Sequence, residues 1–261
     1  MKNRIIILLT GIFIVSLSSC LKDLFCVNGD GIVEVEKRRT TSFDKINNST
    51  SFEIVYKKAD TTGVSIMAEQ NLINHIETNV YGHILKITTS PGTVCLDYTV
   101  KPVITVTSPL LKQAEISGSG DFLADTISGD EIILKISGSG DISAEQISCD
   151  LSQFTISGSG NIDIANLICP NIDILITGSG NATVRGEGEN SHLRITGSGN
   201  IYSGSFQVKT ASVIISGSGN AYTDVEEYLN GLLSGSGNLY VKGDPEIDET
   251  VTGSGRIIKH K

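Results

Sequence analysis

The sequence predicts an all-β protein built as a solenoid of stacked parallel coils, and two observations support this fold class. A Gly-Ser-Gly triplet recurs eight times, and its first glycines are separated by 20, 20, 20, 19, 20, 18 and 18 residues. Between the triplets lie short runs in which apolar and polar residues alternate, as they do in half-buried strands. A period of 18–20 residues holds two strands and two turns, which is one coil of a solenoid. The triplets begin at Gly118, Gly138, Gly158, Gly178, Gly197, Gly217, Gly235 and Gly253.

An antiparallel meander with one glycine turn for every two strands has the same period, so periodicity alone does not decide between the two folds. Stacked coils are favoured because they bring equivalent positions of neighbouring repeats one strand spacing apart. Near-identical residues then form continuous ladders, whereas in a meander they would lie two spacings apart. A propeller blade needs about twice this period.

Each triplet is followed by an Asx residue in all repeats but the last, and this combination is typical of turns. We expect the glycines to adopt positive φ and the Asx side chains to bond turn backbone. Two stacked aspartates repel unless a cation or a polar neighbour lies between them. A calcium ion at Asp121 and Asp141 is one solution, and a plain amide ladder is the favoured one, since five of the eight rungs are Asn. The rungs are Asp121, Asp141, Asn161, Asn181, Asn200, Asn220, Asn238 and Arg256.

The repeated Ile-Ser-Gly-Ser-Gly-Asx and the region before it resemble the family called putative auto-transporter adhesin, head GIN domain, which is common among lipoproteins of Bacteroidetes. The resemblance covers residues 43–258. It implies a right-handed parallel β-helix. The family has no established activity, and its name implies an adhesin.

The first 20 residues read as a lipoprotein signal. Lys2 and Arg4 precede an apolar run over residues 5–15, and Leu17-Ser18-Ser19-Cys20 matches a lipobox. We expect residues 1–19 to be removed and Cys20 to be lipidated; a plain signal peptide or a membrane helix is the alternative, and the run is short for a membrane span. The mature chain would have 242 residues (261 − 19) and a net charge of −11 (18 cations against 29 acids). Because Leu21 rather than Asp follows the cysteine, the predicted location is the outer membrane of the cell envelope, with the side that it faces left open.

The rest of the chain is expected to form one domain. Residues 20–42 are a lipidated tether and an N-terminal edge strand, residues 43–115 form irregular coils, and residues 116–258 form the Gly-Ser-Gly coils. The cationic residues 256–261 are expected to form a charged final strand that protects the open edge of the solenoid.

Four further cysteines lie in a chain whose expected compartment permits disulfides. Cys149 and Cys169 are 20 residues apart, so they occupy the same phase of adjacent coils and lie within disulfide distance. Either they are bridged or they stack as free thiols. Cys26 with Cys95 is a second, weaker pairing.

The sequence argues against several partners. The triplets lack the lysine of a phosphate-binding loop and the full dinucleotide fingerprint, which excludes nucleotide binding. A strongly acidic chain without a basic stripe disfavours nucleic acid. No Cys or His cluster has zinc spacing.

The sequence therefore predicts a non-catalytic cell-envelope lipoprotein that binds glycan or an envelope protein through its repetitive polar faces, without a cofactor unless calcium binds. The alternative is a carbohydrate-active lyase or hydrolase on the same scaffold. Such a site should appear where a repeat departs from the consensus, as at residues 185–189 and 224–228. A polar outward turn explains each departure more simply, so no catalytic residue is assigned.

Overall fold

The computed structural model describes residues 26–93 and 95–260. It is almost all β, with 61% strand and 2% helix, and forms a β-solenoid of about seven turns, which confirms the predicted fold class. Neighbouring coils pair in parallel, so the antiparallel meander is wrong for the Gly-Ser-Gly region. The signal, Cys20 and the first part of the tether lie outside the described residues. In the part of the chain that is described, no helix is long and apolar enough to cross a membrane.

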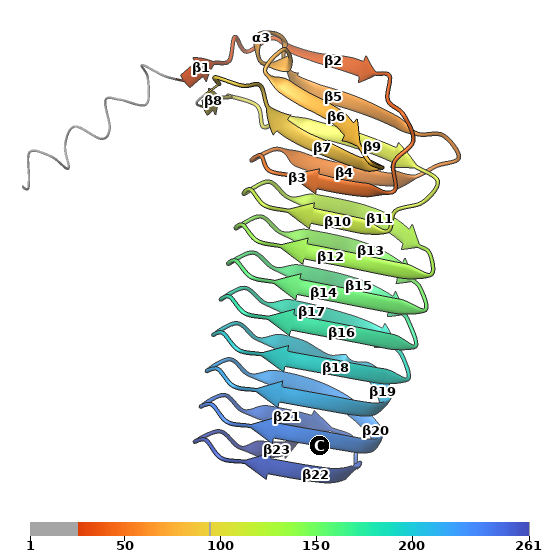
Figure 1. Ribbon diagram of the computed structural model, residues 1–261, viewed down its shortest axis with the longest axis vertical. Helices are drawn as coiled ribbons and strands as arrows, with labels where there is room; N and C mark the ends of the chain where they lie inside the picture. Colours follow the sequence, from red (N-terminus) through yellow and green to blue (C-terminus); the bar gives the residue numbers. More distant parts are fainter. Residues whose placement is uncertain (1–25, 94, 261) are drawn as a thin grey trace, which may run out of the picture.

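Each coil contributes one strand to each of two ladders of parallel strands, which we call the first and second faces and which belong to one continuous sheet of 21 strands (Figure 1). Two long strands, β19 (Ile201–Ile215) and β20 (Ala221–Leu233), bend around the edge and belong to both faces. The first face otherwise contains β7 (Ile84–Thr89), β3 (Lys45–Asn48), β10 (Gln113–Ile116), β12 (Glu131–Ile136), β14 (Leu151–Ile156), β16 (Asn171–Ile176), β18 (Asn190–Ile195) and β22 (Glu246–Val251). The second face contains β9 (Val103–Ser108), β4 (Glu53–Lys58), β11 (Phe122–Ser128), β13 (Ile142–Ser148), β15 (Ile162–Ile168), β17 (Ala182–Glu187), β21 (Leu239–Lys242) and β23 (Ile257–His260).

The core consists of aliphatic columns that run the length of the solenoid. In β12, Ile132, Leu134 and Ile136 point inward and are at most 1% exposed, while the residues between them face out. Each such side chain contributes roughly 1.5–3 kcal/mol by burial. In-register pairing stacks equivalent residues, and one column runs through Ile116, Ile136, Ile156, Ile176, Ile195, Ile215 and Leu233.

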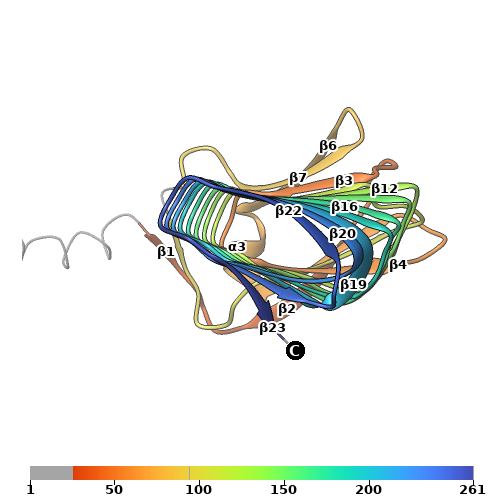
Figure 2. The ribbon, with the colours of Figure 1, turned by 90° about the horizontal axis from the view of Figure 1, so that it is seen from below.

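The Gly-Ser-Gly turns stack along one edge of the solenoid, which we call the triplet edge (Figure 2). The expectation that their glycines adopt positive φ is wrong: among described glycines, positive φ occurs only at Gly31, Gly82, Gly92, Gly186 and Gly243. Close approach of backbones is what requires glycine. A Cβ placed on Gly138 would lie 1.9 Å from the carbonyl oxygen of Gly118, and one on Gly199 would lie 1.8 Å from that of Gly180. Backbone N–H groups bond directly across this contact, as from Ser139 to Gly118 at 3.0 Å.

The N-terminal end is closed by a cap of mixed topology. Residues 43–115, expected to form irregular coils, combine parallel coil strands with antiparallel ones: β5 (Gly63–Glu69) pairs with β9, and β6 (Ile76–Tyr81) with β7. From the segment expected to hold an edge strand, β2 (Val33–Arg38) pairs antiparallel with β5. The short helix α3 (Gln70–Ile73) buries Leu72 and Ile73 over the open core. A disulfide joins Cys26 of β1 (Cys26–Asn28) to Cys95 of β8 (Cys95–Asp97), two strands that pair in parallel. The weaker of the two cysteine pairings is therefore the bonded one.

Glu69, at the end of β5, fastens the cap. Its carboxylate is fully buried and accepts hydrogen bonds from the N–H of Gly31 at 2.8 Å, the N–H of Thr99 at 3.0 Å and the Thr99 hydroxyl at 2.7 Å. These bonds, led by that from the Thr99 hydroxyl, hold the pKa of Glu69 below its ordinary value, although burial opposes them. One ionised side chain thus joins the segment after β1 to the segment after β8.

Replacing Gly199 tests the close approach at the triplet edge. We expect Gly199→Ala to destabilise the chain by at least about 2 kcal/mol, because the new Cβ collides with backbone rather than with a flexible side chain. Urea unfolding followed by circular dichroism measures the loss. Ser198→Ala, at the exposed neighbouring position, is the control and should leave the midpoint unchanged; equal effects of the two variants would contradict this account.

Glu69→Gln should weaken the cap at neutral pH, since a neutral amide accepts weaker hydrogen bonds than a carboxylate. Because the folded pKa is lowered, the ionised group stabilises the cap above the ordinary glutamate pKa of about 4.3, and this stabilisation is lost as the pH falls through the folded pKa. The difference in melting temperature between wild type and variant should therefore shrink on acidification. Glu34→Gln, at an exposed carboxylate on β2, is the matched control. A difference independent of pH would refute the assignment.

Candidate functional site

The Asx residues form a hydrogen-bonded ladder beside the triplet edge. Each Oδ1 accepts the backbone N–H of the next rung at 2.6–3.2 Å, from Asp141 on Asp121 to Arg256 on Asn238. From Asn161 to Asn238, each side-chain amide also donates to the rung before it. Turn backbone is satisfied by amides, which is the arrangement favoured from the sequence.

The two candidate calcium positions, Asp121 and Asp141, are neighbouring rungs of this ladder. Lys101 Nζ lies 2.7 Å from Asp121 Oδ2 and supplies a positive charge at the first rung. Burial raises the pKa of Asp121, but Lys101 and the N–H of Asp141 outweigh it and hold the pKa below its ordinary value. Among the described residues, no three His, Cys, Asp or Glu side chains gather in a way that could hold a metal ion.

Cys149 and Cys169 stack in adjacent coils as two buried free thiols. The Sγ atoms are 3.1 Å apart, longer than a disulfide bond, so of the two alternatives left open by the sequence this structure has the stacked free thiols. The Cys149 thiol donates to Cys169, which raises the pKa of Cys149 and lowers that of Cys169 to about 6.

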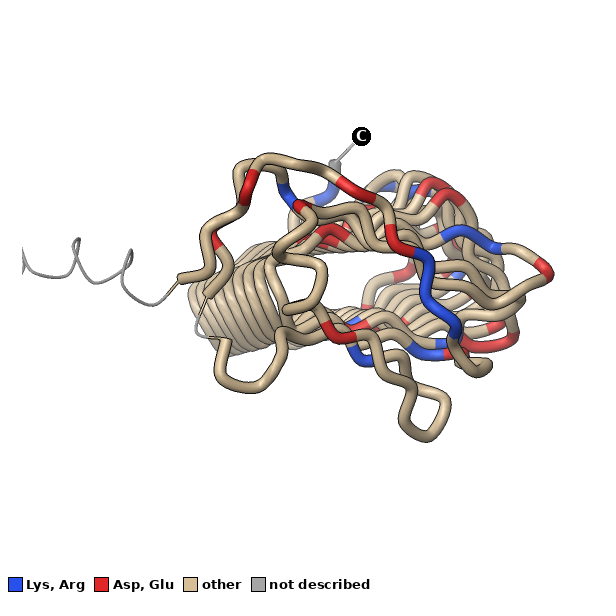
Figure 3. The backbone as a smooth tube through the Cα atoms, turned by 90° about the horizontal axis from the view of Figure 1, so that it is seen from above, with Lys and Arg blue, Asp and Glu red and all other residues tan. Residues whose placement is uncertain are grey.

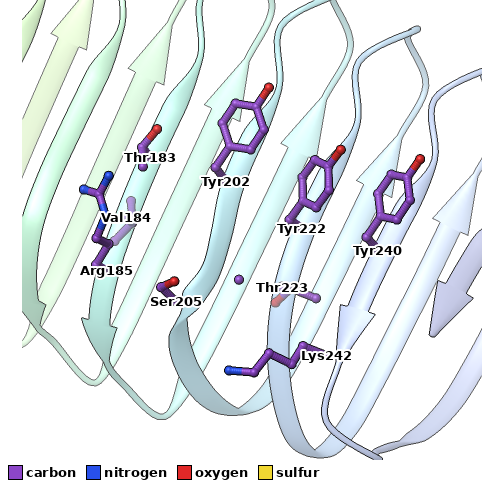
Figure 4. A pocket seen from close by; sticks show the side chains of 10 residues that line it. Thr183, Val184, Arg185, Tyr202, Ser205, Tyr222, Thr223, Tyr240 and Lys242 are labelled. Carbon is purple, nitrogen blue, oxygen red and sulfur yellow. The ribbon is translucent and has the colours of Figure 1, made fainter. Parts of the chain in front are cut away.

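A row of tyrosines forms the most distinctive outward feature. Tyr202, Tyr222 and Tyr240 occupy the same position of β19, β20 and β21 on the second face. Their ring centroids are 5.2 and 4.5 Å apart, with interplanar angles of 22° and 6°. Figure 4 shows the three rings side by side with their hydroxyls pointing the same way. Burial, followed by the two neighbouring tyrosines, raises the pKa of Tyr222 above its ordinary value.

A bulge makes the surface hollow next to these rings. Ser203 pairs with Thr223 and Gln207 with Asp224, so residues 204–206 of β19 have no counterparts in β20. Phe206 turns into the core and is 1% exposed, while Gly204 and Ser205 line the hollow. The hollow has a volume of about 450 Å³. Bulges of this kind re-aim side chains and are common beside functional sites.

Two cations line the hollow, and each is paired with an acid. Arg185 Nη1 lies 2.7 Å from Asp163 Oδ1, and both side chains are exposed. Lys242 Nζ lies 2.6 Å from Asp224 Oδ2, whose residue is only 6% exposed. Local charge is therefore balanced, and the rings, hydroxyls and backbone dominate the surface. Arg185 and Asp224 belong to the two departures from the repeat noted in the sequence.

A second hollow continues along the same face. It has a volume of about 400 Å³, shares Arg185 with the tyrosine hollow, and is lined by Asp125, Glu145 and Asp163. The two hollows meet at Arg185, and together we call them the second-face groove, which crosses β4, β11, β13, β15, β17, β19, β20 and β21. Seven strand spacings make it about 34 Å long.

The first face carries a third hollow of about 510 Å³, lined by amides, hydroxyls, aliphatic side chains, one histidine and one acid. Asp173 lies 3.8 Å from His192 Nδ1 and 3.4 Å from Arg194 Nη2. One carboxylate shared by two basic side chains does not make the pair of carboxylates that glycoside hydrolysis uses.

The tyrosine row could have been found in the sequence. Its members are 20 and 18 residues apart, which is the coil period itself. A functional site was expected where a repeat departs from the consensus, whereas the tyrosine row follows the repeat.

Most of the chain matches a single known protein family. Residues 42–245 match the family described as putative auto-transporter adhesin, head GIN domain. No match was found among functionally curated proteins.

Solved structures from two Parabacteroides species have the same fold. A protein of Parabacteroides distasonis described as a putative lipid binding protein is 27% identical, with a TM-score of 0.85, and the match covers 90% of this chain and 99% of that one. A putative adhesin of the same species is 24% identical with a TM-score of 0.86 and the same coverage. A putative adhesin of Parabacteroides merdae is 22% identical with a TM-score of 0.85, again covering 90% and 99%.

Oxidation tests the thiol pair. We expect excess oxidised glutathione to convert Cys149 and Cys169 of the folded chain into a disulfide, releasing two reduced glutathione molecules through a mixed disulfide. Peptide mapping without reduction should then show the two cysteine peptides joined, and the closed loop should stabilise the chain by about 3 kcal/mol. Cys169→Ser is the control that cannot form the link. Thiols that react only after unfolding would contradict the prediction.

Proposed function

The chain belongs to the putative auto-transporter adhesin, head GIN domain family, and from this premise we propose that it is a non-catalytic, adhesin-like module of the cell envelope that binds a linear glycan in the second-face groove. Family and fold support the adhesin-like module. The glycan is our inference from the groove. The observation that carries it is the stacked row Tyr202, Tyr222 and Tyr240 beside a bulged, hydroxyl-lined hollow.

Aromatic rows suit sugars for a physical reason. A pyranose has apolar C–H faces and a polar rim of hydroxyls, so it stacks on a flat ring and hydrogen-bonds around it. The tyrosine rings are aligned and partly exposed, and Thr183 and Ser205 supply hydroxyls nearby. One strand spacing is close to the length of a sugar unit, so successive rings can meet successive sugars along a chain.

The charge of the groove favours a neutral or weakly charged glycan. Arg185 and Lys242 are each neutralised by an acid, and the far half of the groove carries Asp125, Glu145 and Asp163. A polyanion would meet these carboxylates without unpaired cations to offset them.

The proposed anchor and the tyrosine row lie at different ends of the rod. We propose lipidation at Cys20 and attachment to the outer membrane, with the tether entering at β1. The tyrosines lie in the last coils before the C-terminus (Figure 1), so a lipid-anchored rod would hold them away from the membrane. Repeated, similar contacts along the groove would make binding multivalent.

An enzyme remains the competing function, and the acidic half of the groove is where its chemistry would reside. Asp125, Glu145 and Asp163 gather there, and Asp163 is already held by Arg185. Turnover of a bound polysaccharide would overturn the non-catalytic assignment in favour of a lyase or hydrolase.

The test is a glycan-array and polysaccharide-binding screen of residues 21–261, which keep the Cys26–Cys95 disulfide, with calcium and with a chelator, followed by product analysis of each hit. We expect binding without cleavage. Tyr222→Ala, which removes the central ring, should weaken binding at least tenfold, or about 1.4 kcal/mol. Calcium-independent binding is expected, since Lys101 already holds the first Asp rung.

Tyr228→Ala is the matched control, because this tyrosine is a surface residue of the same strand but lies in the first-face part of β20. It should leave glycan affinity unchanged. Equal losses in the two variants, or no glycan bound at all, would refute the groove as a glycan site, and the envelope protein partner would then become the better hypothesis.

A further inference from the structure

The cap carries an exposed apolar patch that the glycan groove does not use. Thirteen large hydrophobic residues are exposed in the described chain, and six of them belong to the cap. Apart from Tyr81 on β6, the other five lie on or next to β2, β5 and β8. We call this group the cap patch; its members are Ile32 (57% exposed), Val33 (42%), Val35 (62%), Met67 (37%) and Val100 (40%).

Strand pairing brings the central members of the patch onto one side of the β2–β5 pair. Val35 lies directly opposite Met67, and Val33 lies opposite Glu69 in the antiparallel pair β2–β5. The N–H of Gln70 bonds to the carbonyl of Ile32 at 2.8 Å. The buried Glu69 carboxylate, held by the N–H groups of Gly31 and Thr99, thus draws the segments of Ile32 and Val100 together around it.

Because side chains alternate along β2, its two glutamates lie on the face opposite to that of Val33 and Val35. Val33, Val35 and Lys37 share one face of the strand, while Glu34, Glu36 and Arg38 share the other. Arg38 reaches inward to the carbonyls of Ile76 and Ile73 and holds Glu36 at 2.6 Å. Acidic and basic positions are mixed around this end as a whole (Figure 3), so net charge alone does not select a partner.

The length of the tether limits how far the cap patch can lie from the proposed lipid anchor. Cys26 is fixed to Cys95, and only five residues lie between it and Cys20. Even fully extended, the six residue steps from Cys20 to Cys26 span about 20 Å. A cap on so short a tether stays close to the lipid head groups, and Val35 and Met67 are then the apolar side chains available to them.

We propose that the cap patch docks on the lipid bilayer and orients the rod relative to the membrane. This rests on the proposed anchor at Cys20. The interface uses apolar contact by the patch, supported by the exposed Lys37 and Arg39 at anionic head groups.

The chain contains no tryptophan, so a single introduced one reports its own surroundings. The mature chain carries an N-terminal histidine tag in place of acyl chains and binds nickel-chelating lipid in vesicles of phosphatidylethanolamine and phosphatidylglycerol. Brominated lipids then quench the fluorescence of the Val35→Trp variant. Val251→Trp, at a similarly exposed position in the last coil, is the matched control.

We expect the Val35→Trp signal to be quenched at least threefold more than the Val251→Trp signal, and Met67→Asp in the Val35→Trp chain to abolish the difference without changing the melting temperature. Equal quenching at both ends would overturn docking. Emission that is already blue-shifted without vesicles would also overturn it, because residues 21–25 or a second copy would then cover the patch. The tag replaces the lipid, so these outcomes are separate from mass spectrometry of the native chain, which tests acylation at Cys20.

Discussion

Backbone contact at the triplet edge is the constraint on which the rest of the molecule depends. A side chain on the first or third residue of a triplet would collide with the carbonyl of the previous coil, as at Gly138 and Gly199. Glycine there lets the turns nest, and nested turns fix the register of the strands on both sides. Aliphatic columns inside, amide rungs beside the edge and side-chain rows outside all follow from that one register. Stability is then nearly a sum over neighbouring coils.

The same regularity turns sequence variation into surface shape. When every coil has the same path, a residue repeated at the coil period becomes a row, as Tyr202, Tyr222 and Tyr240 do. Extra residues in one strand have no partners in the next strand and must form a bulge. Residues 204–206 form such a bulge, which buries Phe206 and opens the hollow. The triplet edge therefore fixes the fold, and the variable opposite side provides the proposed binding surface.

Periodic features were predictable from the sequence, and isolated ones were not. The parallel stack and the amide ladder follow from the spacing of Gly-Ser-Gly-Asx. The predicted role of the triplet glycines, a turn with positive φ, was wrong. A close approach of backbones also requires glycine, and the sequence pattern does not distinguish the two causes. Pairing of Cys26 with Cys95 spans 69 residues and depends on the cap, whose antiparallel strands and buried Glu69 have no repeat to reveal them. The thiols of Cys149 and Cys169 are in register as expected, but register alone does not form a bond.

The two ends of the solenoid are closed by different means, and this gives the rod a direction. At the C-terminal end, Glu249 follows the buried Gly231 in register and Lys259 follows the buried Val241, so charges stand where the core would continue. Arg256 ends the amide ladder because its side chain offers no acceptor to another rung. Charged residues directed toward an open edge disfavour stacking by a further strand or a second copy. Stacking of a further coil on this end is therefore disfavoured. The opposite end is covered by α3 and β2 and held by a disulfide. A rod that cannot extend itself is suited to act as a single unit, held at its capped end and free to bind along its side.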